Sequence, residues 1–169
     1  MRFMRFLVAF VLVAPVVVAH AASWSGRVVG VKGGDTITVL RDGERVRVTV
    51  FGVECPGRRR PFGAAAKKFT QRLLGGETVT VSPITEEKRG RVLAKVAVRR
   101  TESIEVYRGG RRSERRVKVT VSVADELLKA GMARVSSDAA VDKRLLRLEA
   151  RAKAARQGLW AGPGDPFKD

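Results

Sequence analysis

The turn Gly33-Gly34-Asp35-Thr36 carries residue types that are suited to phosphate chemistry. Two glycines permit a tight turn, and the alternating residues that follow it predict a strand. Such a turn can present the Asp35 carboxylate as an oxygen ligand for a hard cation beside a phosphate. Taken alone, Asp35 is explained more simply as an ordinary turn residue. The segments that follow along the chain therefore decide its interpretation.

Three later segments continue this pattern in a fixed order. They are Glu54-Cys55-Pro56-Gly57, Arg89-Gly90-Arg91 and Gly158-Leu159-Trp160. With the glycine turn, they resemble the staphylococcal nuclease (thermonuclease) family from about Ser25 to Trp160. The resemblance implies a Ca²⁺-dependent endonuclease that cleaves the phosphodiester backbone of DNA or RNA with little sequence preference.

The resemblance also implies a set of metal ligands. Asp35 matches the family's first carboxylate ligand, with Thr36 beside it, and Glu54 stands where the family has a second aspartate. Cys55 matches a position that supplies a backbone carbonyl, so its thiol need not take part. Glutamate keeps the charge at position 54 but adds a methylene of roughly 1.5 Å. We therefore expect Ca²⁺ to bind weakly, although its coordination is flexible.

Gly57 is the most serious departure from the family. It occupies the position of the glutamate that orients or activates the attacking water, and glycine can do neither. A replacement base would have to be Glu54 itself or the loop residues Glu86 and Glu87, which have no motif support. Losing a general base typically lowers the rate by about 10² to 10⁴. The sequence therefore predicts slow metal-assisted cleavage rather than none.

Of the two arginines that bind phosphate in the family, one is matched by Arg91. The position of the other is occupied by Thr49. Arg47 lies two residues earlier, on the same strand face and roughly 6.6 Å away, which is close to the length of an arginine side chain. Arg47 is thus either a substitute phosphate ligand or an exposed basic strand residue. Gly33 also replaces an aspartate that the family usually carries.

Residues 1–21 have the features of a secretory signal. Arg2 and Arg5 precede the apolar run Phe6 to Ala19, and Ala19-His20-Ala21 offers small residues at a signal-peptidase spacing. The apolar run is shorter than the roughly 20 residues that span a bilayer. We expect cleavage after Ala21 and export to a periplasm or the medium, with no stable membrane association, although an uncleaved anchor is the alternative.

Without that segment the chain has 32 basic and 17 acidic residues and no histidine. The lack of histidine excludes a histidine general base, a histidine-ligated zinc and a Ser-His triad. The single cysteine excludes an internal disulfide. The large positive charge favours a polyanionic partner, with nucleic acid first and anionic envelope polymers or lipid headgroups as alternatives.

The predicted fold class is α+β, mainly β: a five-stranded oligonucleotide-binding-type barrel with about three helices. We assign residues 22–160 to this domain and residues 161–169 to a flexible tail. Expected strands are Trp24–Lys32, Thr36–Leu40, Arg45–Val53, Thr78–Val81 and Arg91–Val98, and expected helices are Phe62–Leu74, Ala124–Ala130 and Ala139–Arg156. Trp160 is expected to close the core as a large apolar plug.

An inserted β-hairpin is predicted at about residues 99–121. Eight basic and three acidic residues lie between Arg99 and Lys118. Candidate substrate-binding residues are Arg58, Arg59, Arg60, Arg111 and Arg112. The hairpin is equally explained as a solvated charged arm. Three functions stay open: an endonuclease of reduced activity, a catalytically inactive module that binds nucleic acid, and an exported protein that binds another protein or an envelope polymer.

Overall fold

The structure, a computed structural model, describes residues 22–87, 91–139, 142–162 and 167. The predicted signal segment lies outside the described residues. So do Arg89 and Gly90 of the predicted phosphate-binding segment, whereas Arg91 is described.

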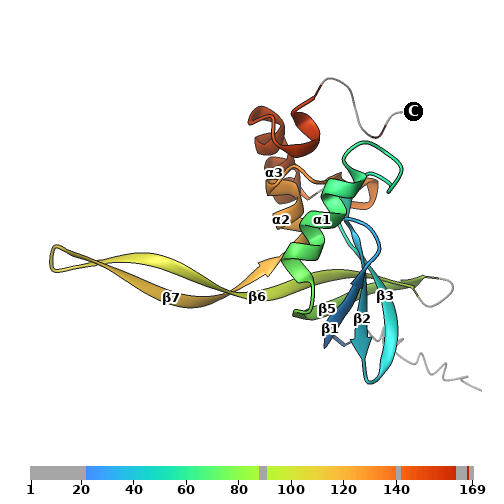
Figure 1. The fold of residues 1–169 in the computed structure, drawn as a ribbon, viewed down its shortest axis with the longest axis horizontal. Helices are drawn as coiled ribbons and strands as arrows, with labels where there is room; N and C mark the ends of the chain where they lie inside the picture. Colours follow the sequence, from blue (N-terminus) through green and yellow to red (C-terminus); the bar gives the residue numbers. More distant parts are fainter. Residues whose placement is uncertain (1–21, 88–90, 140–141, 163–166, 168–169) are drawn as a thin grey trace, which may run out of the picture.

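The described strands form one large sheet that curls back on itself. Strands β1 (Trp24–Val31), β2 (Thr36–Arg41), β3 (Glu44–Val50), β5 (Thr78–Glu87), β6 (Arg91–Arg108) and β7 (Arg111–Ser122) lie in the order β3-β2-β1-β5-β6-β7. A parallel pairing of β3 with β6 joins the two ends of the five-strand set (Figure 1). Strands β4 (Val53–Glu54) and β8 (Arg134–Val135) form a small second sheet.

The predicted class, mainly β with three α-helices, is confirmed. Five strands close through the β3–β6 pairing, as predicted, and β7 adds the second strand of the predicted hairpin, so the sheet is not a strict barrel. The predicted third strand also breaks after Val50, where Gly52 adopts a φ of 92° and separates β3 from β4. A positive φ of this kind is readily adopted by glycine and ends regular strand geometry.

Helices α1 (Gly63–Leu74), α2 (Val123–Lys129) and α3 (Lys143–Ala154) stand together beside the sheet (Figure 1). Two 3₁₀ turns, η1 (Ser137–Ala139) and η2 (Gly158–Trp160), flank α3. The predicted last helix therefore starts too early: Asp142 caps α3 by accepting from the Arg144 and Leu145 N–H groups, at 2.9 and 3.3 Å. Such a cap satisfies N–H groups that have no partner inside the helix.

The core lies between the inner sheet face and the helices. It contains mainly Ile37, Val39, Val48, Val50, Val79, Val81, Val98, Leu74, Leu127 and Leu128. Leu159, which is 1% exposed, is the buried residue of the carboxy-terminal turn. Trp160 is only half-buried, with the Lys153 ammonium 4.4 Å from its ring centre. The expectation that Trp160 plugs the core is thus wrong, because η2 points Leu159 inward instead.

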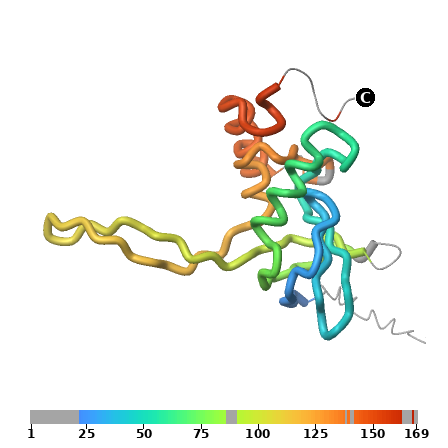
Figure 2. Tube along the Cα trace, in the orientation of Figure 1, coloured from blue at the N-terminus to red at the C-terminus, as the bar shows by residue number. Residues whose placement is uncertain are grey.

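A long two-stranded ribbon extends from the sheet. β6 and β7 pair continuously from Ala97 opposite Ser122 to Arg108 opposite Arg111. The turn is Gly109-Gly110, with φ angles of 56° and 77°. Two consecutive positive φ angles match the primed turns that suit the twist of a hairpin. Figures 1 and 2 show that this predicted hairpin projects well away from the helices and the other strands.

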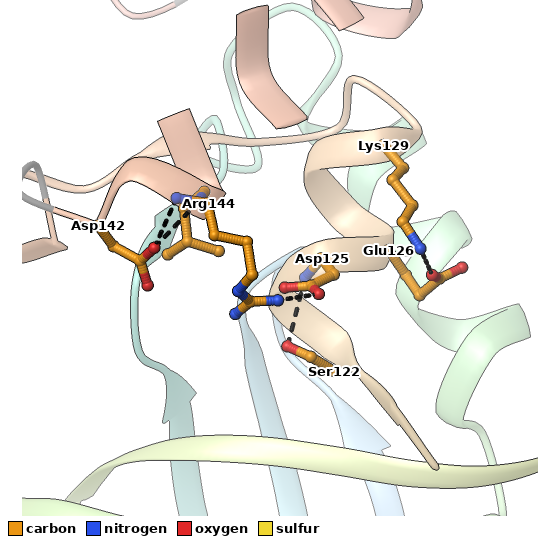
Figure 3. Close-up of polar contacts among 7 residues, drawn as sticks. Ser122, Asp125, Glu126, Lys129, Asp142 and Arg144 are labelled. Atoms are coloured by element: carbon orange, nitrogen blue, oxygen red, sulfur yellow. Dashed lines mark hydrogen bonds and ion pairs between the residues drawn. The ribbon is translucent and has the colours of Figure 1, made fainter. Parts of the chain in front are cut away.

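Polar contacts fix the root of the ribbon to the helices (Figure 3). Ser122 ends β7 and caps α2, because its Oγ accepts from the Asp125 N–H at 3.4 Å. The Asp125 carboxylate pairs with Arg144 of α3. The next residue of α2 is Glu126. Its carboxylate accepts a hydrogen bond from Lys129 Nζ, which raises the pKa of Lys129. The ribbon therefore leaves the domain from an anchored point.

Candidate phosphate-binding cleft

A cleft of about 390 Å³ lies where the β1–β2 turn meets β3, β6 and the segment after β4. The residues lining it are Lys32, Gly33, Gly34, Asp35, Thr36, Arg47, Thr49, Cys55, Pro56, Gly57, Arg58 and Arg91. The structure thus brings together most of the segments that the sequence singled out. Nothing in the fold itself tests the chemical roles of these residues, which stay predictions.

Asp35 is held in a fixed orientation at one wall of the cleft. Its Oδ1 accepts a hydrogen bond from Thr36 Oγ1, and its Oδ2 accepts one from the Cys55 N–H, each at 2.9 Å. The Asp35 carbonyl accepts from the Val50 N–H at 2.8 Å. Asp35 is therefore tied to β3 through its carbonyl and to the segment after β4 through its carboxylate before any ligand arrives.

Gly34 presses this turn against its neighbours. A Cβ at Gly34 would lie 2.5 Å from Cys55 Sγ and 2.8 Å from the Ala66 Cβ of α1. Thr70 Oγ1 donates to the Gly34 carbonyl, also at 2.5 Å. Since real Cβ atoms do not approach other atoms this closely, the contact requires glycine. It fixes the position of Asp35 relative to α1.

Arg47 and Arg91 are direct partners in the parallel β3–β6 pairing, and both side chains line the cleft. Thr49 lies two residues further along β3 and is paired with Thr36. The alternation argument for Arg47 thus agrees with the geometry. Lys32 and Arg58 complete a cationic set around Asp35.

Lys32 is the cleft residue that the sequence reasoning missed. It comes directly before the glycine turn, and its N–H donates to the Thr36 carbonyl at 2.9 Å. Its place next to that turn was the available signal. With Gly33 in place of the family's usual aspartate, the mouth of the cleft gains a positive charge and lacks a negative one.

Cys55 is buried beneath the cleft, with 8% of its surface exposed. Burial raises the pKa of its thiol well above the usual value, and the negative charges of Asp35 and Glu54 raise it further. The thiol therefore stays neutral and serves as a small packing group at neutral pH.

Glu54 is not among the residues that line the cleft. Its Oε2 accepts from Arg134 Nε at 3.0 Å and from Arg134 Nη2 at 2.9 Å, across the β4–β8 pairing. The Arg134 guanidinium also lies 4.1 Å from the ring centre of Phe167. The pairing with Arg134 therefore occupies the carboxylate that the resemblance assigns to the metal.

The residues present do not fit the calcium ion that the resemblance implies. Among the described residues that line the cleft, Asp35 is the one carboxylate, and four cationic side chains surround it. The described part of the chain contains no group of three or more acidic, cysteine or histidine residues that could hold a metal. Ca²⁺ usually takes six to eight oxygen ligands, several of them carboxylates. The cleft instead has the charge of an anion site.

Gly57 leaves its part of the cleft open. A Cβ placed there would meet no heavy atom within 4 Å beyond its chain neighbours. A glutamate could therefore be accommodated at this position. The side chains of Glu86 and Glu87, the other candidate bases, lie outside the described part of the structure.

The predicted substrate-binding arginines fall in two places. Of the Arg58 to Arg60 run, Arg58 lines the cleft, Arg59 is exposed, and Arg60 Nη1 donates to the Phe167 carbonyl at 2.7 Å. Arg111 and Arg112 lie beside the ribbon turn, where Arg112 pairs with Glu105. The structure therefore does not gather these arginines into one site.

A curled sheet flanked by helices, with an oriented aspartate and two strand arginines in one cleft, defines a nuclease-like protein. The model of the staphylococcal nuclease homologue family matches residues 47–162. The chain belongs to this family.

Three bacterial proteins of similar sequence are consistent with this family assignment. A protein of Escherichia coli described as an uncharacterized endonuclease is 27% identical over 163 residues, covering 95% of this chain and 92% of the relative. Protein ParB of Escherichia coli is 33% identical over 161 residues, covering 90% and 84%. The micrococcal nuclease of Shigella flexneri is 27% identical over 165 residues, covering 94% and 88%.

Proposed function

We propose that this protein binds the phosphodiester backbone of nucleic acid in the cleft and cleaves it as an endonuclease of reduced activity. The observation that carries the proposal is that Lys32, Arg47, Arg58 and Arg91 line the same cleft as one oriented carboxylate, Asp35. Family membership and relatives named as endonucleases support the reaction class.

The division of roles follows from charge and position. Arg47 and Arg91 neutralise the non-bridging phosphate oxygens, since guanidinium groups pair with phosphate through two parallel hydrogen bonds. Positive charge at these oxygens also stabilises the charge that develops when water attacks phosphorus and the bond to the leaving oxygen breaks. No side chain at position 57 takes the proton from that water, so the attack is slow.

Calcium has a minor place in this proposal. The family's reaction uses Ca²⁺, and here Asp35 and the Cys55 carbonyl are the groups that the resemblance assigns to it. The pairing of Glu54 with Arg134 and the cationic lining both weaken its binding. We therefore expect Ca²⁺ to bind weakly at most, and the cationic side chains to carry the phosphate binding.

A second candidate function is a catalytically inactive module that binds nucleic acid or another polyanion. The open space at Gly57 favours it, because among the described cleft residues only Asp35 carries a carboxylate. Binding through cationic side chains does not require a general base.

Export is a further part of the proposal. It is supported by residues 1–21, whose basic start, apolar run and small residues have the order of a secretory signal. Within the described ranges, no helix is long and apolar enough to cross a membrane.

The test is a cleavage assay of the mature chain on labelled single-stranded and double-stranded DNA and RNA, with Ca²⁺ and with a chelator. Asp35→Ala serves as the comparison variant. Slow cutting that disappears in Asp35→Ala supports the endonuclease. Salt-sensitive binding without cutting assigns the inactive module, and no binding to any of these substrates overturns both.

A further inference from the structure

The β6–β7 ribbon has two chemically different faces. In an antiparallel pair, residues opposite each other point to the same side, so the register assigns each side chain to a face. The polar ribbon face consists of Arg99, Thr101, Ser103, Glu105, Tyr107, Arg112, Glu114, Arg116, Lys118 and Thr120. The apolar ribbon face consists of Arg100, Glu102, Ile104, Val106, Arg108, Arg111, Ser113, Arg115, Val117 and Val119.

Every side chain on the polar ribbon face can form hydrogen bonds. Arginine, lysine, threonine, serine and tyrosine contact phosphates and base edges in nucleic acids, and the two glutamates of this face, Glu105 and Glu114, can accept hydrogen bonds from cytosine amino groups. The opposite face interleaves four arginines and Glu102 with a diagonal row of aliphatic side chains, and its inner end continues into the core at Val98 and Val121. Both faces carry positive charge, but the polar face is the one without an aliphatic row, so it suits a hydrated partner along its whole length.

The polar ribbon face continues the outer surface of the strand that carries the cleft arginine. Along β6, Ala94, Val96 and Val98 are buried, so the alternate residues point outward. Arg91 and Lys95 belong to this outward set and are exposed, and the same alternation reaches Arg99. A polyanion bound at Arg91 can thus extend along β6 onto the ribbon.

We propose that the ribbon lies in the major groove of double-stranded DNA, with its polar face toward the bases, while the cleft holds the backbone. This inference rests on the proposed function. The major groove of B-form DNA, about 12 Å wide, admits a two-stranded β-ribbon. The paired stretch from Arg99 to Arg108 spans roughly 30 Å, close to one helical turn.

The same geometry separates DNA from RNA. The major groove of an RNA duplex is deep and narrow, so side chains on a ribbon do not reach its bases. A single strand has no groove to receive the ribbon. The occupant assigned here is therefore B-form duplex DNA.

Charge argues against a second copy of the chain as the occupant. Two ribbons packed through their apolar faces would bring together Arg100, Arg108, Arg111 and Arg115 of both copies, with Glu102 as the acidic residue on each face. Like charges opposite each other destabilise such pairs. Duplex DNA instead supplies negative charge that balances the ribbon's eight basic against three acidic residues.

The anchored root makes the ribbon a preformed element. Ser122 joins β7 to α2, and the Asp125–Arg144 pair joins α2 to α3, as Figure 3 shows. A ribbon held at its base loses less conformational freedom on binding than a free segment does.

The test compares two variants that each remove three positive charges. The polar-face variant is Arg112→Gln, Arg116→Gln and Lys118→Gln, and the matched apolar-face variant is Arg100→Gln, Arg108→Gln and Arg115→Gln. Since each phosphate contact contributes about 0.9 to the slope of log affinity against log salt, the polar-face variant should lower the slope for a 30-base-pair DNA by about 2 to 3. The apolar-face variant should change it by less than about 1.

A third variant, with residues 103–116 replaced by Asn-Gly, keeps Glu102 opposite Val117 as the last pair and tests the ribbon without relying on single charges. It should lose the preference for duplex DNA over duplex RNA. Circular dichroism checks that all variants remain folded. Protection of guanine N7 from methylation reports occupation of the major groove directly.

The outcomes separate the two proposals. Equal slope changes in the two charge variants, equal affinity for duplex RNA, or unprotected N7 atoms would overturn the groove assignment, including in favour of a protein or lipid partner for the ribbon. A four-nucleotide oligonucleotide is too short to span both cleft and ribbon. If it binds normally while those results are found, the cleft proposal stands and the ribbon inference fails. If neither it nor the long duplex binds, the proposed function itself fails.

Discussion

The cleft and the ribbon share strand β6, yet different interactions hold them in place. In the cleft, the glycine turn is fixed: Asp35 by two hydrogen bonds and Gly34 by contacts with Cys55 and Ala66. On the ribbon, nearly all side chains are exposed, and the backbone ladder holds the strands together with a few cross-strand contacts such as the Arg112–Glu105 pair. The scaffold of a reaction site can therefore persist where its reactive side chains have changed, because the scaffold residues also stabilise the core.

The ribbon is under no such constraint. Its side chains contact solvent, so substitutions there have small effects on stability. The charge of the ribbon can therefore change to suit a binding partner without unfolding the protein. If the proposed function and the groove assignment hold, the missing groups of the cleft and the charged side chains of the ribbon mean that this protein holds nucleic acid more than it turns it over.

The largest expected effect comes from restoring the missing groups in the cleft. Gly57→Glu with Thr49→Arg should raise the cleavage rate by about 10² to 10⁴, because it returns the general base and the second phosphate-binding arginine. Position 57 has open space for the new side chain. Single-turnover cleavage of labelled DNA measures it. Gly57→Gln with Thr49→Arg is the control, since it matches the size without the basic carboxylate. No gain over this control would mean that the family's site does not transfer to this chain.

Removing a cleft cation should weaken binding without touching the ribbon. Arg91→Gln should lower the affinity for a four-nucleotide oligonucleotide by about tenfold to a hundredfold, the range for a hydrogen bond to a charged group. Arg45→Gln, on the neighbouring β3 but outside the cleft lining, is the matched control. Equal losses in the two variants, measured by fluorescence anisotropy, would show that net charge and not the cleft governs binding.

Two glycines distinguish scaffold from chemistry within the cleft. Gly34→Ala should lower the free energy of unfolding by about 1–3 kcal/mol, because its Cβ would overlap Cys55 and Ala66. Gly57→Ala, in open space, should change it by less than about 0.5 kcal/mol. Urea unfolding followed by circular dichroism provides both values. A stable Gly34→Ala protein would contradict the packing described for the turn.

The smallest effect is a pH dependence from Cys55. Since burial raises the pKa of this thiol, the folded protein keeps the proton at pH values where the unfolded chain releases it. Stability should therefore be unaffected below about pH 8.5 and fall above it, by at most about 1.4 kcal/mol per pH unit. Cys55→Ala should remove this part of the decline between pH 8.5 and 10. An identical decline in both proteins would assign it to other groups.

Much of the fold was predictable from local pattern. Alternating valines in β1, β2, β3 and β6 gave the strands, and the Asp42-Gly43 and Gly109-Gly110 turns gave the hairpins. The start of α3 and the burial of Leu159 in place of Trp160 were missed, because both depend on how the carboxy-terminal segment docks onto α2 and the sheet. Local periodicity carries no information about that docking.

The candidate site was predictable in part. The grouping of Asp35 and Arg91 followed from the family resemblance, that of Arg47 from strand alternation, and all three residues line one cleft in the structure. The pairing of Glu54 with Arg134 was not predictable, because these residues are 80 positions apart and meet only through the β4–β8 pairing. The place of Lys32 in the cleft lining likewise depends on how the β1–β2 turn meets the other segments.

The most direct test of the central claim is a long single-turnover time course on labelled duplex DNA. The wild-type mature chain is compared with Asp35→Ala combined with Arg91→Gln, which serves as the blank for contaminating nucleases. We predict that the wild type cuts slowly but faster than the blank, since the cleft still holds phosphate beside an oriented carboxylate. Salt-sensitive binding with cutting no faster than the blank would contradict it and leave a nuclease fold that only binds.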